Sequence, residues 1–221
     1  MSETIEALGH QQMPVPAGRK IATVTRTARE LFLRQGFSAT SMDAIAKAAS
    51  VSKATLYAYF PSKEALFAFL IVAECESLER DLPLPDLTAG LAQALRIFAR
   101  QYMRVFIERN DVAFVRVIAN ESGRFPDLCR LFYDSGPRAT IGRLAQFLDE
   151  AKAKGLLDFR DSIMAATQFL SLVRGELPLR TVLGLALTDE KAIDLEIESG
   201  LNLFLRACTP IAPQEQDLTA R

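Results

Sequence analysis

Residues 40–66, TSMDAIAKAASVSKATLYAYFPSKEAL, constrain the fold of this chain more than any other segment. Apolar residues recur at helical spacing in its first part, which predicts a short helix with one apolar face. Thr40 stands at the expected N-cap position with Asp43 three residues on, an arrangement typical of a capping box. The helical pattern breaks at Ser50, and Ser52 can cap a second short helix. The segment therefore predicts two short helices joined by a tight turn.

The second of these helices carries too many polar and aromatic side chains for a fully buried segment. These side chains are Lys53, Thr55, Tyr57 and Tyr59. Pro61 then ends the helix, and a longer one begins near Ser62. The spacing fits a helix-turn-helix, in which the second helix enters the major groove of DNA.

Residues 19–66 resemble the N-terminal domain of the tetracycline-repressor (TetR) family of bacterial regulators. The matching residues, in chain order, are Ala28-Arg29-Glu30-Leu31-Phe32, Gly36-Phe37, Thr40-Ser41-Met42, Ile45-Ala46, Ala48, Val51-Ser52-Lys53-Ala54-Thr55-Leu56-Tyr57, Tyr59-Phe60 and Lys63-Glu64. Ser50 departs from the pattern, since the family usually has glycine at this turn. If the turn requires a positive φ, serine costs about 1 kcal/mol there.

The resemblance implies that the second helix is the recognition helix. Lys53 and Tyr57 are four residues apart, hence on one helical face, and are predicted to read base edges. Ala54 lacks bulk and would let the helix approach the groove closely. Five positions match phosphate contacts of the family: Thr40, Ser52, Thr55, Tyr59 and Lys63. The alternative for each serine or threonine is a plain helix cap, and for Tyr57 a packed aromatic ring.

The charge distribution agrees with a DNA-binding N-terminal part. The formal net charge of the whole chain is −1, but residues 19–63 hold eight basic and two acidic residues. From residue 64 onward there are 18 basic and 23 acidic residues. A basic head on an acidic body is expected if only the head meets phosphates.

Length and pattern predict an all-α chain of 221 residues, with 49% hydrophobic residues to bury. The expected helices are approximately 19–35, 62–81, 87–109, 112–122, 126–154, 161–183 and 189–207. The predicted parts are a flexible N-terminal arm (1–18), a three-helix helix-turn-helix domain (19–66), a larger helical effector-binding and dimerisation domain (67–209) and a polar tail (210–221).

The C-terminal part resembles an AefR-type C-terminal domain. The residues that carry this resemblance are Arg124-Phe125-Pro126-Asp127-Leu128, Phe132-Tyr133, Gly136-Pro137, Phe169-Leu170 and Arg174-Gly175. In the family such helices enclose an effector, whose binding alters the spacing of the two DNA-binding heads. The predicted pocket residues are Phe98, Tyr102, Phe106, Phe114, Ile118 and Glu121. A mainly apolar cavity would suit a lipophilic or aromatic effector; the alternative is that the aromatic stripe is ordinary core.

The last two expected helices are predicted to form a homodimer as a four-helix bundle, as the family does. Their apolar faces are Ile163, Ala166, Phe169, Leu170 and Val173 on one helix, and Ile193, Ile197, Leu201 and Leu205 on the other. Gly200 would permit close approach of two helices. The alternative is that these faces form the core of a single chain.

Several other classes of protein are disfavoured by the sequence. The only histidine is His10, in the predicted arm, so a Ser-His or Cys-His catalytic pair is not expected. No phosphate-binding glycine-rich loop, clustered metal ligands or dinucleotide motif is found, so we expect no enzyme, no cofactor and no metal. Three cysteines lie far apart, which predicts free thiols; a thiol sensor is the alternative. No apolar run reaches the about 20 residues that span a bilayer, so we expect a cytoplasmic protein without a membrane partner.

The sequence thus predicts a cytoplasmic, homodimeric transcriptional regulator. It would bind an inverted-repeat operator in double-stranded DNA and be released by a small hydrophobic effector. The assignment as a repressor comes from the family resemblance and from no single residue. The alternative function is an all-helical interaction scaffold without sequence-specific DNA binding.

Overall fold

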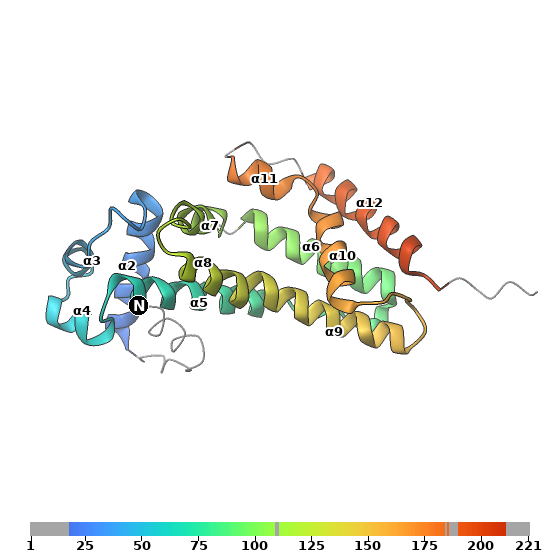
Figure 1. Cartoon of the computed structure of the whole chain (residues 1–221), viewed down its shortest axis with the longest axis horizontal. Helices are drawn as coiled ribbons and strands as arrows, with labels where there is room; N and C mark the ends of the chain where they lie inside the picture. Colours follow the sequence, from blue (N-terminus) through green and yellow to red (C-terminus); the bar gives the residue numbers. More distant parts are fainter. Residues whose placement is uncertain (1–17, 109–110, 184, 186–189, 211–221) are drawn as a thin grey trace, which may run out of the picture. The chain divides into compact units, whose positions relative to one another are not determined.

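The computed structural model describes residues 18–108, 111–183, 185 and 190–210, and these residues contain helices and no strand (Figure 1). The predicted all-α class is confirmed. The helices are α2 (Arg19–Gln35), α3 (Met42–Ala48), α4 (Lys53–Tyr59), α5 (Lys63–Asp81), α6 (Leu91–Glu108), α7 (Asp111–Asn120), α8 (Pro126–Tyr133), α9 (Ala139–Ala153), α10 (Ser162–Arg174), α11 (Leu177–Val182) and α12 (Glu190–Cys208). A short 3-10 helix, Leu87–Ala89, precedes α6, and a π-helical turn, Asp134–Arg138, joins α8 to α9.

The chain divides into two compact units. The first comprises residues 1–82 and 104–140, and the second comprises 83–103 and 141–221. The expected boundary after residue 66 falls inside α5, whose buried side chains continue the core of the first unit.

Phenylalanine rings hold the first unit together. Phe67 of α5 packs edge-on against Phe32 of α2, with ring centroids 5.0 Å apart, and lies 5.4 Å from Phe114 of α7. Phe37 lies 4.7 Å from Phe67 and 5.1 Å from Phe125, just before α8. Each fully buried ring contributes roughly 1.5–3 kcal/mol by leaving water, and such ring pairs add about 0.5–1.5 kcal/mol. The first unit is therefore a rigid base for the two short helices α3 and α4.

In the second unit, ion pairs join α6 to α12. Arg96 Nε lies 2.5 Å from Glu198 Oε1, and Arg100 Nε lies 3.0 Å from Asp194 Oδ1. The hydrogen bond from Arg96 holds the pKa of the Glu198 carboxyl below its usual value. These exposed or half-exposed pairs set the register between the two helices more than they stabilise them.

The helices α10 and α12 lie side by side and pack closely (Figure 1). A Cβ atom on Gly200 would lie 2.7 Å from the backbone carbonyl of Leu172, so only glycine allows this approach. Phe169 and Phe204 meet edge-on at 5.1 Å between ring centroids.

This packing corrects the predicted dimer faces. Most of the residues assigned to them are buried within the chain itself: Ala166, Phe169, Leu170, Val173, Ile197 and Leu201. The helical repeat identified which residues share a face, but the neighbouring helix of the same chain covers that face. Ile163 is 53% exposed, and Ile193 and Leu205 are half-buried.

The expected helix 161–183 is wrong as a single helix. It breaks at Gly175, which has φ +46° and ends α10, and α11 begins two residues later at Leu177. Glycine takes up this left-handed conformation without the steric cost that other residues pay. The break turns the chain and brings α11 to the side of a pocket described below.

Within the described residues, no single helix is long and apolar enough to span a membrane. Only α4 and α5 taken together, a pair bent by 57°, reach that length and composition.

Candidate nucleic-acid interface

The turn between α3 and α4 contains a positive φ at Ser50, the position where the family usually has glycine. Ser50 has φ +54° and is the one non-glycine residue with a positive φ in the described part of the chain. The amide of Val51 donates to the carbonyl of Ala46 at 3.0 Å, and that of Ser50 to the carbonyl of Lys47 at 3.2 Å. These bonds close the turn. Serine at this positive φ costs about 1 kcal/mol, which glycine would avoid.

The helix α4 has one buried and one exposed side. Leu56 is buried, as is Phe60 just after the helix, and both belong to the core of the first unit. On the other side Lys53, Ala54 and Tyr57 face solvent. Tyr57 is 48% exposed and Tyr59 is 38% exposed, so neither ring is packed in the core.

Lys53 is paired in this structure. Its ammonium lies 2.5 Å from the Asp43 carboxylate on α3, and both side chains are more than half exposed. An exposed pair of this kind is worth about 0.2–1 kcal/mol, so it orients the lysine without holding it firmly. A DNA base or phosphate can therefore compete with Asp43 for the ammonium.

Ser52 and Thr55 form a helix cap at the start of α4. The Ser52 hydroxyl accepts the amide of Thr55 at 3.0 Å and lies 2.7 Å from the Thr55 hydroxyl. The cap predicted for Ser52 is confirmed. Ser52 is exposed and Thr55 half-buried, so capping leaves the Ser52 side chain accessible at the N-terminus of α4.

The capping prediction for Thr40 is wrong. Ser41 caps α3 instead, accepting the amide of Ala44 at 3.1 Å. The Thr40 side chain is 2% exposed, donates to the carbonyl of Gly36 at 2.7 Å and accepts from Gln35 at 3.0 Å. Thr40 thus ties the loop before α3 to the end of α2, and its phosphate contact stays a prediction that this inward hydroxyl does not favour.

Lys63 also turns toward the protein. Its ammonium donates to the carbonyl of Phe37 at 2.8 Å and to that of Ser38 at 3.3 Å, and lies 4.4 Å from the centre of the Phe37 ring. Desolvation lowers the pKa of Lys63, with neighbouring carboxylates acting in the opposite direction. The lysine braces the loop before α3, and its predicted phosphate contact stays untested.

Glu121 binds the same loop through hydrogen bonds to Ser38. Its carboxylate accepts the Ser38 amide at 3.0 Å and the Ser38 hydroxyl at 2.7 Å, although 83 residues separate the two in sequence. Glu121 is 8% exposed, and Arg124 reaches the same hydroxyl at 3.4 Å. We call Ser38, Lys63, Glu121 and Arg124 the loop clamp. No sequence signal points to the clamp, because a lone glutamate at a helix end has many possible partners.

The six residues predicted to line an effector pocket are divided between the two units. Phe114 and Ile118 are buried in the core of the first unit, which also holds Glu121 in the loop clamp. Phe98 and Tyr102 belong to the second unit, where their rings stack 6.4 Å apart. The side chain of Phe106 lies outside the described residues. A single pocket made by all six stays a prediction.

The three cysteines, Cys75, Cys129 and Cys208, are thiols that form no disulfide bond, as predicted. Burial raises the pKa of Cys129 and of Cys208, which disfavours the reactive thiolate.

Two known families match different parts of the chain. Residues 24–70 match the family described as bacterial regulatory proteins of the tetR family. Residues 93–209 match the family described as the C-terminal domain of AefR-like transcriptional repressors.

Similar proteins cover the chain to different extents. The solved structure of the flavonoid-responsive regulator FrrA is 72% identical, covering 89% of this chain and all of that one, with a TM-score of 0.82. A TetR-family regulator from Mesorhizobium loti shares the fold at 22% identity and a TM-score of 0.78, covering 87% of this chain and 98% of its own. The curated regulator UidR of Escherichia coli K12 is 43% identical over 53 residues, 24% of this chain and 27% of UidR. The chain therefore matches well under two thirds of the length of that curated relative.

A helix-turn-helix on a rigid aromatic core, with a basic and hydroxyl-bearing outer face, defines a DNA-binding transcriptional regulator. The two family matches, separated by residues 71–92, together cover most of the described chain. The chain belongs to the TetR family and has an AefR-like C-terminal domain. The interaction scaffold considered from the sequence is thereby set aside.

Proposed function

We propose that this chain is a cytoplasmic repressor that binds an inverted-repeat operator as a homodimer and is released by a flavonoid. The observation that carries the effector class is the 72% identity to the flavonoid-responsive regulator across 89% of the chain. Flavonoids are small, flat and mainly apolar, which agrees with the hydrophobic effector expected from the sequence.

In the proposed complex α4 enters the major groove. Lys53 leaves Asp43 to reach the O6 and N7 acceptors of a guanine, and Tyr57 meets a neighbouring base with its hydroxyl or its ring. Ala54, between them, has a small side chain, so the backbone of α4 can approach the groove. Phosphate contacts are assigned to the exposed rim of α4: Ser52, Thr55 and Tyr59. The loop clamp holds α3 in place behind this surface.

The dimer surface is assigned to the exposed sides of α10 and α12. Four apolar side chains there are more than half exposed: Ile163, Met164, Leu195 and Leu203. Leu195 and Leu203 are eight residues apart and so lie on one face of α12. Apolar side chains gathered in this way are typical of a protein interface. A symmetric dimer would place two recognition helices about 34 Å apart, or a multiple of that, which requires an inverted repeat.

The test measures binding of the purified protein to inverted repeats from its own promoter region by fluorescence anisotropy. Naringenin and genistein are then titrated in. We expect specific binding that weakens with the flavonoid, and linkage requires that operator DNA weakens flavonoid binding by the same factor. Specific DNA binding that no flavonoid alters would contradict the effector class and leave the regulator assignment intact.

A further inference from the structure

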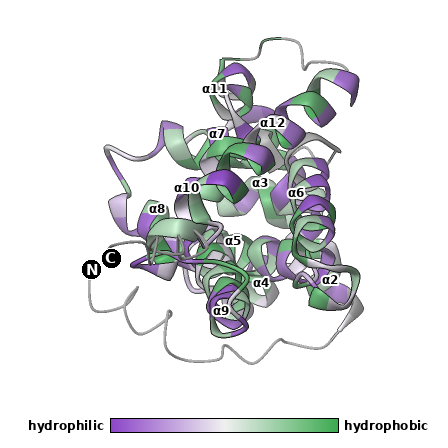
Figure 2. Ribbon diagram, turned by 90° about the vertical axis from the view of Figure 1, so that its right-hand side faces the viewer, coloured by the Kyte–Doolittle hydropathy of each residue, from purple (hydrophilic) through white to green (hydrophobic). Residues whose placement is uncertain are grey.

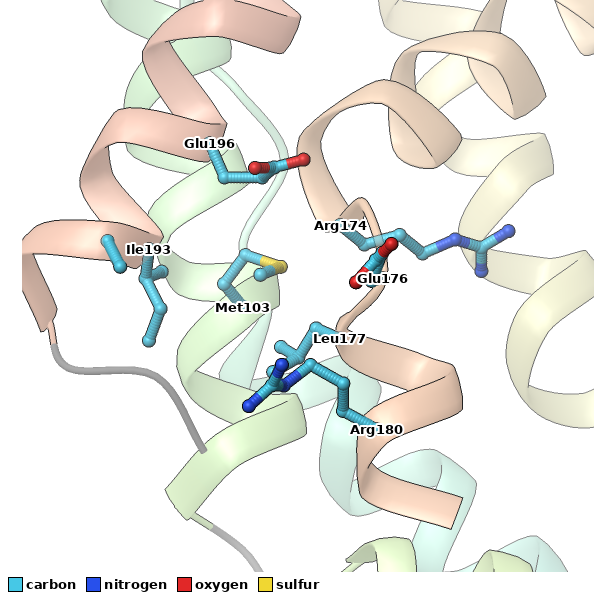
Figure 3. Close-up of a pocket in the computed structure, with 8 residues that line it drawn as sticks. Met103, Arg174, Glu176, Leu177, Arg180, Ile193 and Glu196 are labelled. Carbon is cyan, nitrogen blue, oxygen red and sulfur yellow. The ribbon is translucent and has the colours of Figure 1, made fainter. Parts of the chain in front are cut away.

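The second unit contains a pocket of about 330 Å³ (Figure 3). It lies among the C-terminal end of α6, the corner between α10 and α11, α11 itself and the first turns of α12. Its volume is at the lower end of the range for small-molecule sites, about 300–1,000 Å³. None of the six residues predicted from the sequence lines it.

One part of the lining is apolar and comes from three helices. Met103 reaches in from α6, Leu177 from α11 and Ile193 from α12 (Figure 3). Met103 and Leu177 are buried, while Ile193 is half-buried at the edge. A thioether and two branched aliphatic chains can adapt to the face of a flat ring system.

The other part of the lining is polar and rich in hydrogen-bond acceptors. Glu176 and Glu196 both line the pocket and are exposed, and among the described residues their carboxylates have no hydrogen bond or ion pair. A Cβ atom on Gly175 would collide with the Glu196 carboxylate, so the glycine at this corner makes room for it. Arg180 adds guanidinium donors from α11.

Arg174 takes part differently. Figure 3 shows its guanidinium directed away from Met103 and Ile193, so that only its stem borders the pocket. It donates to the hydroxyl of Tyr102 and approaches the Ser171 hydroxyl at 3.4 Å. The acidic groups of the pocket therefore outnumber the basic group that is directed toward it, which disfavours a ligand anion such as a fatty acid.

We propose that this pocket binds a planar polyphenol, with its rings against Met103, Leu177 and Ile193. Phenolic hydroxyls donate to the carboxylates of Glu176 and Glu196, and the ring carbonyl accepts from Arg180. Hydrogen bonds to an ionised acceptor are about twice as strong as neutral ones. A phenolic hydroxyl can therefore replace water at these exposed carboxylates, whereas a ring without hydroxyls leaves the water in place or removes it without a substitute. The inference rests on the flavonoid effector class proposed above and assigns it to named residues.

The test compares two ligands by isothermal titration calorimetry on the full chain. Apigenin is planar and carries phenolic hydroxyls, whereas flavone has the same ring system without them. Glu196→Gln should weaken apigenin binding about threefold to tenfold, because a charged acceptor becomes neutral, and should leave flavone binding unchanged. Glu176→Gln should behave in the same way. Glu150→Gln on the exposed side of α9 is the matched control and should alter neither ligand.

A third pocket variant tests the apolar wall. Ile193→Trp fills the pocket and should abolish binding of both apigenin and flavone, while thermal unfolding shows that the protein remains folded. If the wild type binds apigenin and all three pocket variants bind it equally well, the site is overturned while the effector class stands. If the wild type binds neither ligand, the effector class fails and this inference fails with it. Tight binding of a fatty acid that Glu196→Gln strengthens would also overturn the proposal.

Discussion

The exposed sides of α4 and α12 differ in composition, as do the partners proposed for them. Both helices bury one side in a tight core, Leu56 on α4 and Leu201 on α12. The outer side of α4 presents a lysine, hydroxyls and tyrosines. The outer side of α12 carries two exposed leucines, Leu195 and Leu203, among charged residues, and Figure 2 shows hydrophobic and hydrophilic residues alternating along this helix. The first composition suits a charged, hydrated duplex and the exposed leucines suit a second subunit, which are the partners proposed above.

The largest expected effect comes from the contact that buries the inner side of α12. Gly200→Ala places a methyl group 2.7 Å from the backbone of Leu172, which cannot move aside as a side chain could. We expect the free energy of unfolding, measured with urea, to fall by about 3 kcal/mol. Gly142→Ala on α9 is the control: nothing lies within 4 Å of its Cβ, and helix propensity should raise stability by about 0.8 kcal/mol. Similar values for both variants would mean that α10 and α12 do not pack this closely.

A substitution on the outer side of α12 should change dimerisation and not the stability of the fold. Leu203→Glu puts a carboxylate into the proposed interface twice, once from each subunit, and should weaken dimerisation by about 2–3 kcal/mol. Sedimentation velocity should show monomers, with helical content unchanged by circular dichroism. Leu201→Ala, two residues away but 1% exposed, should instead lower stability and leave any remaining folded protein dimeric. A Leu203→Glu variant that stays dimeric at low micromolar concentration would place the interface elsewhere.

A substitution on the outer side of α4 should change the preference of the protein for operator over random DNA. Lys53→Ala is expected to cost about 1–2 kcal/mol per half-site on the operator, with little loss on random DNA. Lys63→Ala should weaken both complexes about equally if that lysine meets a phosphate, with a shallower salt dependence. Anisotropy isotherms on matched duplexes at several salt concentrations separate the two. Equal losses on both duplexes for Lys53→Ala would remove its base-reading role.

The smallest expected effect concerns the loop clamp behind α3. Glu121→Gln retains the shape of the side chain but removes its charge from two hydrogen bonds to Ser38, so stability should fall by about 1 kcal/mol. Operator affinity should fall with it, since the loop before α3 loosens. Glu30→Gln on the exposed side of α2 serves as the control. An unchanged urea midpoint for Glu121→Gln would show that the clamp contributes nothing in solution.

Local chemistry was readable without the structure. The cap at Ser52, the turn at Ser50 and the ends of α2 follow from residues within a few positions of one another. Prediction failed where two neighbouring residues compete for the same role, as with Ser41 and Thr40 at the start of α3. It also failed at Gly175, because a glycine can lie within a helix or end it, depending on the packing around it.

By itself the sequence determined the all-α class, the helix-turn-helix and the exposure of Lys53 and Tyr57 on α4. These follow from periodicity and capping, which act over a few residues. Only the tertiary structure decided that the inner sides of α10 and α12 cover each other, that Glu121 holds Ser38, and that Glu176 and Glu196 face one pocket. A helical repeat records which side of a helix is apolar, but the identity of the partner depends on long-range packing that no short segment encodes.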